Sequence, residues 1–343
     1  MASRMFVMAV PGLAPLVERE LDEVGGLTVT DRGCDGRADL VLFEASADHR
    51  STALDLRTAE DAFVEVGRTR RAEGDDAGRV AGRLWSRQRI EGALSVWAGM
   101  VRPLHAAMTY RVVVRVLQER PFLRTELRQQ VARAVAAGRP RWRPADPAEL
   151  EIWVSEYRPG QLVAGLRVSG EAMRQHGGRS VERPGALRPT LAAAMVRLAG
   201  RPRSHLLDPC CGSGTILAEA TAAGWACRGF DLDPEAVQAA RRNAPGAEIE
   251  IGDARRLELP SGSVAACVSN LPFGRRYAPQ GRSDRWLSEV LAELRRVTRP
   301  GGRLVLLAPR LDRRQVPAGL RQTERLPIRL LGLPTTIWAF DQR

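Results

Sequence analysis

The chain has 343 residues, of which 44% are hydrophobic and 27% charged, and a formal net charge of +12. This length suggests two or three domains, and this composition excludes disordered and fibrous proteins. No apolar run approaches the roughly 18 residues of a membrane span, and the five cysteines form no C-x-x-C pair. The sequence therefore predicts a soluble, cytoplasmic protein without a membrane anchor, disulfide framework or metal site.

The positive charge is unevenly distributed. All 52 basic residues are arginine, and GC-rich coding explains the missing lysine but not the excess of positive over negative charge. Residues 101–200 contain 17 arginines and 8 acidic residues, and residues 251–343 contain the same numbers. This predicts two contact zones for a polyanion, with solvated charge on helix faces as the alternative.

The first half predicts small mixed α/β units without a nucleotide-binding turn. Alternating or β-branched apolar residues predict strands at residues 5–10, 39–43, 62–66, 110–117, 152–155 and 162–168. Apolar residues at helical spacing predict helices at residues 13–24, 88–100 and 122–137.

The second half predicts a doubly wound parallel sheet. Residues 169–186 lack periodicity and form the best inter-domain linker. Strands and helices then alternate, which is typical of α/β folds. The predicted strands are residues 205–208, 226–230, 248–251, 264–269 and 302–307, and the predicted helices are 187–198, 214–223, 234–243 and 285–298. Residues 323–329 and 335–340 predict an antiparallel pair that closes the sheet.

A glycine-rich turn follows the first of these strands. It runs from Asp208 through Cys210, Gly212 and Gly214, and glycines in such a turn let the backbone approach a ligand at a helix start. The G-x-G pattern alone is weak. A dinucleotide-binding turn needs a third glycine where this chain has Leu217, so the pattern disfavours NAD and favours a smaller adenosyl ligand.

Carboxylates follow the next two strands. Asp231 comes where ribose hydroxyls would lie, and Asp253, followed by Ala254, comes where a carboxylate would accept a hydrogen bond from an adenine amino group. The alternative for each acid is a helix N-cap, which is the better interpretation for Asp233 before Pro234.

The strand at 264–269 leads into Asn270-Leu271-Pro272-Phe273. An exocyclic base amine is a poor nucleophile that must be oriented, and the Asn270 carboxamide with the Leu271 carbonyl could accept its two hydrogens. Pro272 would fix the backbone, and Phe273 would stack on an extruded base. The alternative is an ordinary turn with a buried Phe. Arg275 and Arg276 follow, and they either grip phosphates or belong to a solvated loop.

With DPCCGSGT, FDLDP, GDA and NLPFG in this order, the second half resembles the class I methyltransferases, and more closely the THUMP-domain tRNA guanine-N2 methyltransferases. The resemblance implies S-adenosylmethionine as cofactor, held by the glycine turn, Asp231 and Asp253, with Pro189 and Thr190 near its methionine end. It also implies four segments. These are a ferredoxin-like unit at 1–55, a THUMP domain at 56–168, the linker at 169–186 and the methyltransferase domain at 187–343.

The resemblance further implies a tRNA substrate. THUMP domains hold the 3′ end of tRNA, so a guanosine in or near the acceptor stem is the expected target. Arginines of the basic middle region are the candidate RNA contacts, namely Arg102, Arg111, Arg124 and Arg128. A monomer is expected, and a small activating partner protein stays open. The alternatives are a DNA or other RNA amino-methyltransferase, a protein glutamine methyltransferase, and a non-catalytic RNA-binding protein with a methyltransferase fold.

Overall fold

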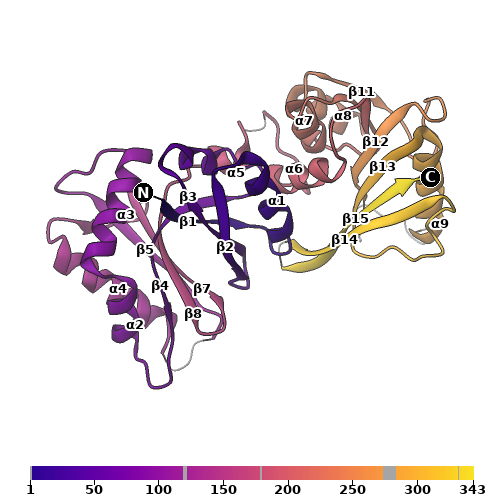
Figure 1. The fold of residues 1–343 in the computed structure, drawn as a ribbon. Coiled ribbons are helices and arrows are strands. Elements are labelled where there is room, and N and C mark those ends of the chain that lie inside the picture. Colours follow the sequence, from indigo (N-terminus) through magenta and orange to yellow (C-terminus); the bar gives the residue numbers. More distant parts are fainter. Residues whose placement is uncertain (1, 119–121, 178–179, 273–282, 331) are drawn as a thin grey trace. The chain divides into compact units, whose positions relative to one another are not determined.

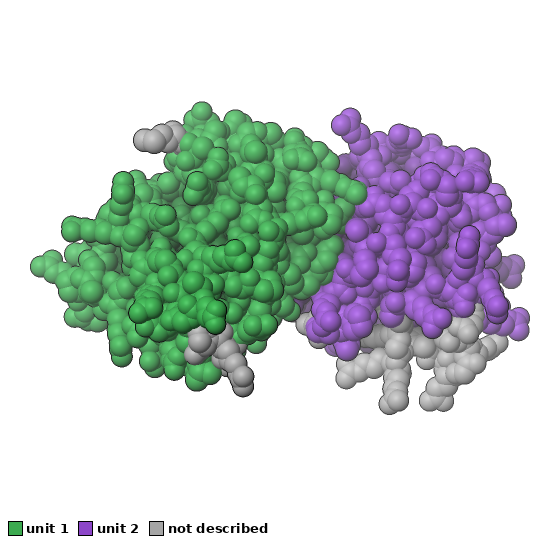
Figure 2. Space-filling model, turned by 60° about the horizontal axis from the view of Figure 1, so that its bottom comes forward, with its two compact units in different colours: residues 1–174 green, residues 175–343 purple. Residues whose placement is uncertain are grey.

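The computed structural model describes residues 2–118, 122–177, 180–272, 283–330 and 332–343. The chain divides into two compact units, Met1–Arg174 and Gln175–Arg343, which are coloured separately in Figure 2. The division falls within the segment 169–186 where the sequence predicts a linker. Within the described residues, no helix has both the length and the apolar character needed to cross a bilayer.

In its described residues, unit 1 is built on an eight-stranded sheet with strand order β2-β3-β1-β4-β8-β7-β5-β6 (Figure 1). β5 runs parallel to β6 and β7, and the other neighbours are antiparallel. Val7 of β1 lies opposite Ala62 of β4, so the predicted ferredoxin-like and THUMP segments share one sheet, and their division at residue 55 stays a prediction. The strands are β1 Ser3–Ala9, β2 Leu27–Cys34, β3 Asp39–Ala45, β4 Asp61–Arg70, β5 Thr109–Arg115, β6 Arg143–Pro144, β7 Leu150–Arg158 and β8 Gln161–Arg167.

Aromatic packing holds this sheet together. The rings of Phe6 and Phe63 stack with centroids 4.6 Å apart, and Trp153 lies 5.5 Å from Phe63. Gly165 leaves room for this pair, because a Cβ there would come within 2.4 Å of the Phe6 ring. The helices are α1 Ala14–Val24, α2 Ala77–Leu84, α3 Arg87–Met100, α4 Arg124–Gly138 and α5 Ala172–Gln175, with short 3-10 turns at Ala47–His49 and Ser51–Leu54.

In its described residues, unit 2 contains the predicted α/β sheet, with seven strands in the order β11-β10-β9-β12-β13-β15-β14. The first five are parallel, and β15 runs antiparallel to both of its neighbours, which confirms the predicted closing pair. The strands are β9 His205–Asp208, β10 Ala226–Asp231, β11 Ala247–Ile251, β12 Val264–Asn270, β13 Thr298–Ala308, β14 Leu320–Leu330 and β15 Leu333–Gln342.

Helices pack on this sheet as the alternation predicts. α6 packs on α7, and α7 packs on α8. α9 contributes Val290, Leu291 and Leu294 to the apolar cluster that includes Leu304 and Leu306 of β13. The helices of unit 2 are α6 Pro189–Leu198, α7 Thr215–Ala222, α8 Pro234–Asn243 and α9 Ser283–Val297.

Candidate active site

Four predicted site residues lie at one edge of the unit 2 sheet. Asp208 ends β9, Asp231 ends β10, Asn270 ends β12, and Asp253 follows β11 by two residues. These strands are neighbours and run parallel, so their carboxyl ends share an edge. Ligands of open α/β sheets bind beyond this edge. Residues that are far apart in the sequence therefore form one site.

The two glycines of the turn serve different purposes. Gly212 has φ +52° and a Cβ there would meet nothing within 4 Å, so this residue borders open space. Gly214 has φ +80°, and a Cβ there would come within 2.9 Å of Ala240 Cα. Both backbone conformations favour glycine. Gly214 thus allows close packing of α7 on α8, and Gly212 is the better candidate to line a cofactor.

Asp231 fixes the shape of this turn. Its Oδ2 accepts a hydrogen bond from the Gly212 amide at 2.9 Å, and its Oδ1 accepts one from the Asp233 amide at 3.0 Å. Each carboxylate oxygen has a second lone pair, so the half-buried side chain can still accept ribose hydroxyls. Asp233 caps α8 through the Glu235 amide at 2.9 Å, as the N-cap interpretation predicted.

Asp208 lies under the turn and is 1% exposed. Its Oδ1 accepts hydrogen bonds from the Ser269 hydroxyl at 2.7 Å and from the Cys210 amide at 3.2 Å. Burial raises the pKa of Asp208 to about 7, and the negative charge of Asp231 adds to the rise. Asp208 therefore braces the strand that carries Asn270, and the sequence analysis did not identify Ser269 as its partner.

Asp253 is engaged by a neighbouring arginine. Arg255 Nε lies 3.0 Å from both carboxylate oxygens, and its Nη2 lies 2.5 Å from Oδ2. The hydrogen bonds from Arg255 lower the pKa of Asp253, so this side chain is a carboxylate at neutral pH. Its predicted contact with an adenine amino group would have to be shared with this guanidinium. Ala254, the other predicted residue here, is buried.

Two buried hydroxyls belong to segments at the starts of α6 and α7. Thr190, in the first turn of α6 after Pro189, and Ser213, in the glycine-rich turn, are both under 5% exposed. Their Oγ atoms have no hydrogen-bond partner among the described residues. A buried hydroxyl without a partner costs about 1–3 kcal/mol. The open space beside Gly212, the Ser213 hydroxyl in the same turn and the Asp231 carboxylate together suit a polar adenosyl ligand. Whether Thr190 contacts this ligand stays a prediction.

Asn243, which the sequence analysis did not single out, ties the linker to the turn. Its Nδ2 donates to the carbonyls of Val181 and Ser213, both at 2.8 Å, and its Oδ1 accepts from the Val181 amide at 3.0 Å. One carboxamide at the end of α8 thereby holds the segment that leads into α6 against the glycine-rich turn.

The described part of the predicted catalytic turn ends at Pro272. Asn270 is half-buried and pairs with Leu307 of β13, Leu271 is 1% exposed, and Pro272 is half-buried. The main chain therefore leaves the sheet at Asn270. Phe273, Arg275 and Arg276 lie outside the described residues, so their predicted contacts with a base and with phosphates stay predictions.

The predicted RNA contacts in unit 1 differ in their surroundings. Arg111 bonds Asp146 at 2.7 Å and Glu151 at 2.9 Å, and Arg102 pairs with Glu149 at 3.3 Å. Arg128 is exposed on α4. Arg124, in the first turn of α4, is exposed and has an interaction partner. Further exposed arginines of α2, α3 and α4 are Arg79, Arg83, Arg87, Arg89 and Arg133, of which Arg83 is paired with Asp75. They were not among the arginines predicted from the sequence.

The sheet order and the site at its carboxyl edge define the fold of S-adenosylmethionine-dependent methyltransferases. Residues 176–328 match the family described as "UPF0020: RMKL-like, methyltransferase domain", so this part of the chain is similar to a methyltransferase domain.

Similar proteins extend the comparison. The chain is 30% identical to the tRNA (guanine(6)-N(2))-methyltransferase THUMP3 of Bos taurus, over 49% of this chain and 37% of that protein. It is 34% identical to a tRNA (guanine(10)-N2)-dimethyltransferase of Methanothermobacter thermautotrophicus, over 37% of this chain and 39% of that protein. A protein of unassigned function in transposon TN4556 of Streptomyces fradiae is 39% identical over 34% of this chain and 33% of that protein. The chain thus spans only about a third to two fifths of these relatives.

Solved structures match the whole chain. TrmN from Thermus thermophilus superposes with a TM-score of 0.76 at 23% identity, and the match covers 100% of both chains. SMU.472, whose structure was determined in complex with SAH, gives a TM-score of 0.71 at 17% identity and covers 100% of this chain and 98% of that one. These matches show that the chain shares its α/β fold with both proteins over its whole length, and the predicted THUMP domain in unit 1 stays a prediction.

Proposed function

We propose that this protein uses S-adenosylmethionine to methylate the exocyclic N2 amine of a guanosine in tRNA. The observation that carries the proposal is the juxtaposition, at one sheet edge, of the turn held by Asp231 with Asn270-Leu271-Pro272. The named relatives that methylate guanine N2 in tRNA support the choice of substrate. A cytoplasmic location, a monomeric state and a target in the acceptor-stem region belong to the same proposal.

The residues at the edge fit the proposed cofactor. S-adenosylmethionine, when bound, supplies an electrophilic methyl group on a sulfonium ion. Gly212 would leave space for it, Asp231 would accept its ribose hydroxyls, and Thr190 and Ser213 would find partners for their buried hydroxyls. Asp253 would face its adenine amino group while still paired with Arg255.

Asn270 and Leu271 would orient the amine. The Asn270 Oδ1 and the Leu271 main-chain carbonyl each accept one amine hydrogen, which directs the nitrogen lone pair toward the methyl group. A carboxamide cannot act as a general base, so the proton on nitrogen is lost to solvent after transfer. Holding the reacting atoms roughly 3–3.5 Å apart accounts for much of the rate enhancement.

Exposed arginines of unit 1 support an RNA partner. α2, α3 and α4 pack on the sheet of unit 1 and carry Arg79, Arg87, Arg89, Arg128 and Arg133 on their exposed faces. Each arginine–phosphate contact makes binding more sensitive to salt: the logarithm of the association constant falls against the logarithm of the salt concentration with a slope of about −0.7 per contact for single strands and −0.9 for duplex DNA. Replacing Arg128 by Gln should weaken tRNA binding. It should also reduce the salt dependence of the association constant by the amount expected for one phosphate contact. Replacing the carboxylate-paired Arg111 should change the slope less.

To test the proposal, the protein is incubated with labelled S-adenosylmethionine and, in separate reactions, with bulk tRNA, duplex DNA or a protein mixture, and the transferred label is measured. Label in tRNA alone supports the proposal. Label in DNA would favour the DNA amino-methyltransferase alternative, and label in protein the glutamine methyltransferase alternative. Calorimetry with S-adenosylmethionine tests the remaining alternative, a non-catalytic RNA-binding protein. Such a protein would bind tRNA but would not bind S-adenosylmethionine.

A further inference from the structure

β14 forms the outer edge of the unit 2 sheet and reaches the same end of the sheet as the proposed catalytic turn. Asn270 pairs with Leu307 of β13. Leu307 pairs with Ile337 of β15, which in turn pairs with Leu326 of β14. This row crosses four neighbouring strands, and neighbouring strands lie about 4.8 Å apart. Leu326 is therefore on the order of 14 Å from Asn270, within the reach of one bound RNA strand.

The hairpin of β14 and β15 continues beyond the end of β13. β13 ends at Ala308, which pairs with Thr336. β14 and β15 stay paired as far as Leu330 and Leu333, and Leu333 is 71% exposed. The hairpin thus projects past the edge of the sheet at which the cofactor and the target base are proposed to bind. An RNA strand that enters the site from this side would pass along it.

One face of β14 carries two exposed arginines. Arg325 lies opposite Trp338, and its guanidinium carbon is 5.1 Å from the centre of the Trp338 ring. Trp338 is itself fixed by a hydrogen bond from its Nε1 to the Ala308 carbonyl at 3.1 Å. A guanidinium stacked on an aromatic ring is pre-organised and still presents its planar fork of N–H donors. Arg329, four residues further along, lies on the same face of the strand and is exposed.

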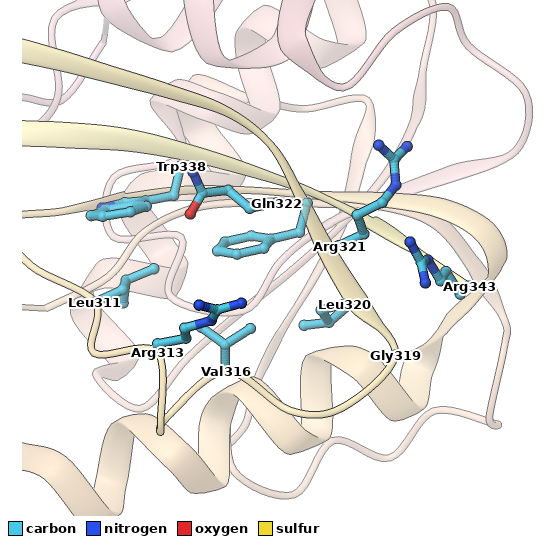
Figure 3. Close-up of a pocket in the computed structure, with 10 residues that line it drawn as sticks. Leu311, Arg313, Val316, Gly319, Leu320, Arg321, Gln322, Trp338 and Arg343 are labelled. Atoms are coloured by element: carbon cyan, nitrogen blue, oxygen red, sulfur yellow. The ribbon is translucent and has the colours of Figure 1, made fainter.

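The connection from β13 to β14 adds three guanidinium groups to the same side of the sheet. This connection lies over Trp338, and Arg313 and Trp338 border one hollow (Figure 3). Arg310, Arg313 and Arg314 are all exposed, and none of them forms an ion pair with a described residue. Asp312 is the one acidic residue of the connection, and its carboxylate accepts a hydrogen bond from the Arg314 amide at 3.0 Å. Positive charge therefore predominates here.

We infer that this β14 arginine surface binds phosphates of the RNA strand whose target base enters the proposed active site. The surface consists of Arg310, Arg313, Arg314, Arg325 and Arg329. Guanidinium groups match phosphate oxygens in a planar, bidentate geometry. The sequence predicts a polyanion contact in residues 251–343, and the arginines of unit 1 leave that contact unassigned. The inference rests on the proposed function, because it takes RNA as the substrate.

The same residues suit a protein strand less well. An exposed edge strand can pair with a strand of another protein, but Pro327 has no amide to donate and proline in an edge strand hinders such pairing. Arginines also protect edge strands from pairing, yet those of the connection do not lie on the edge strand. Arg321, at the start of β14, is bound by Asp341 at 2.8 Å and is not part of the surface.

Filter binding of tRNA to the full chain at a series of salt concentrations tests this inference. The assay needs neither cofactor nor catalysis, so its result is separate from that of the proposed methyl transfer. Polyglutamate is the second probe, because it carries negative charge without phosphate. Two paired variants remove different parts of the surface, namely Arg325→Gln with Arg329→Gln and Arg313→Gln with Arg314→Gln.

Arg201→Gln with Arg203→Gln is the matched control. It removes the same charge from two exposed arginines that precede β9, at the opposite edge of the sheet. This control should bind tRNA within about two-fold of the wild type, since charges further apart than about 10 Å are largely screened at 0.1 M salt.

Each paired surface variant should bind tRNA about ten-fold more weakly or worse, because each lost charge-assisted hydrogen bond contributes on that scale. The slope of the logarithm of the association constant against that of salt should become shallower by about 1.4 to 1.8, the amount for two phosphate contacts. Polyglutamate binding should not change.

Binding of tRNA to both variants as tightly as to the control would overturn the inference. Equal losses of polyglutamate and tRNA binding would assign the surface to acidic proteins and overturn it too. If Arg325→Gln with Arg329→Gln unfolds because the Trp338 stack is lost, the variant of the connection still decides. Weaker tRNA binding by the variants, together with no N2-methylguanosine from the wild type, would support the surface and refute the proposed function alone.

Discussion

The Ser269 hydroxyl donates a 2.7 Å hydrogen bond to Asp208 Oδ1 and so joins β12 to β9 one residue before Asn270. The bond lies within the buried sheet and links the strand of the glycine-rich turn to the strand of the proposed catalytic turn. The two halves of the proposed active site are therefore mechanically connected through a carboxyl group whose pKa is raised to about 7.

This carboxyl group should make stability depend on pH. The pKa of Asp208 is higher in the folded protein than the ordinary value of 3.8, so the folded state binds the proton more tightly than the unfolded state. The free energy of unfolding should therefore fall as pH rises from about 4 to about 7, by at most about 1.4 kcal/mol per pH unit. Urea unfolding of the wild type and of Asp208→Asn at a series of pH values measures this contribution. An equal slope in both proteins would contradict it.

Much of the proposed site could be predicted from the sequence because its signals are local. Asp208, Asp231 and Asn270 each end a strand and Asp253 follows one by two residues, and parallel strands bring their carboxyl ends together. Ser269 and Asn243 could not be assigned partners, because their hydrogen bonds span 61 and 62 residues of sequence.

The missed elements in unit 1 have similar physical reasons. β2, Leu27–Cys34, lies at the edge of the sheet, and its alternation of apolar and polar residues extends only over Leu27–Thr30 before Asp31 and Arg32 interrupt it. α2 spans only eight residues, although Asp76 before it does cap the helix by accepting from the Arg79 amide.

In unit 2, the Arg255 guanidinium on Asp253 was also not predicted, because a neighbouring charge in the sequence does not reveal the direction of a side chain.

Alanine at the two turn glycines should affect different properties, mainly fold stability at Gly214 and mainly cofactor affinity at Gly212. Gly214→Ala should destabilise the fold by about 2 kcal/mol or more, because it adds a positive-φ penalty to a contact with the Ala240 backbone. Gly212→Ala should cost only about 1 kcal/mol of stability but weaken cofactor binding, because its methyl enters open space. Chemical denaturation and calorimetry with S-adenosylhomocysteine distinguish the two. Loss of stability at Gly212 with unchanged cofactor affinity would refute its assignment.

The Arg255 pair with Asp253 should tune cofactor affinity. Asp253→Ala should weaken S-adenosylhomocysteine binding about ten-fold, since a hydrogen bond to a charged group contributes about 1.5–3 kcal/mol. Arg255→Ala should preserve or strengthen binding, because it frees both carboxylate oxygens. Arg256→Ala, an exposed neighbour, serves as the control. If Arg255→Ala instead weakens binding as much as Asp253→Ala, the pair acts as a unit and the carboxylate alone is not the adenine contact.

Asn243 should position the linker and the turn together. Asn243→Asp keeps an acceptor for the Val181 amide but removes the donor to two carbonyls. It should raise the KM for the cofactor more than it lowers kcat, because the residue touches neither substrate nor reacting atoms. Steady-state kinetics at constant tRNA, with the Tm of both proteins recorded, measures the split. A fall in kcat with an unchanged cofactor KM would argue against a positioning role.

Nucleoside mass spectrometry of tRNA treated with the wild type and with Asn270→Ala tests the central proposal most directly. N2-methylguanosine is expected with the wild type, at a yield about two to three orders of magnitude higher than with the variant. Cofactor binding of the two proteins should agree within a few-fold, since Asn270 orients the amine rather than the cofactor. A methylated nucleoside other than N2-methylguanosine, or equal yields from the two proteins, would contradict the account.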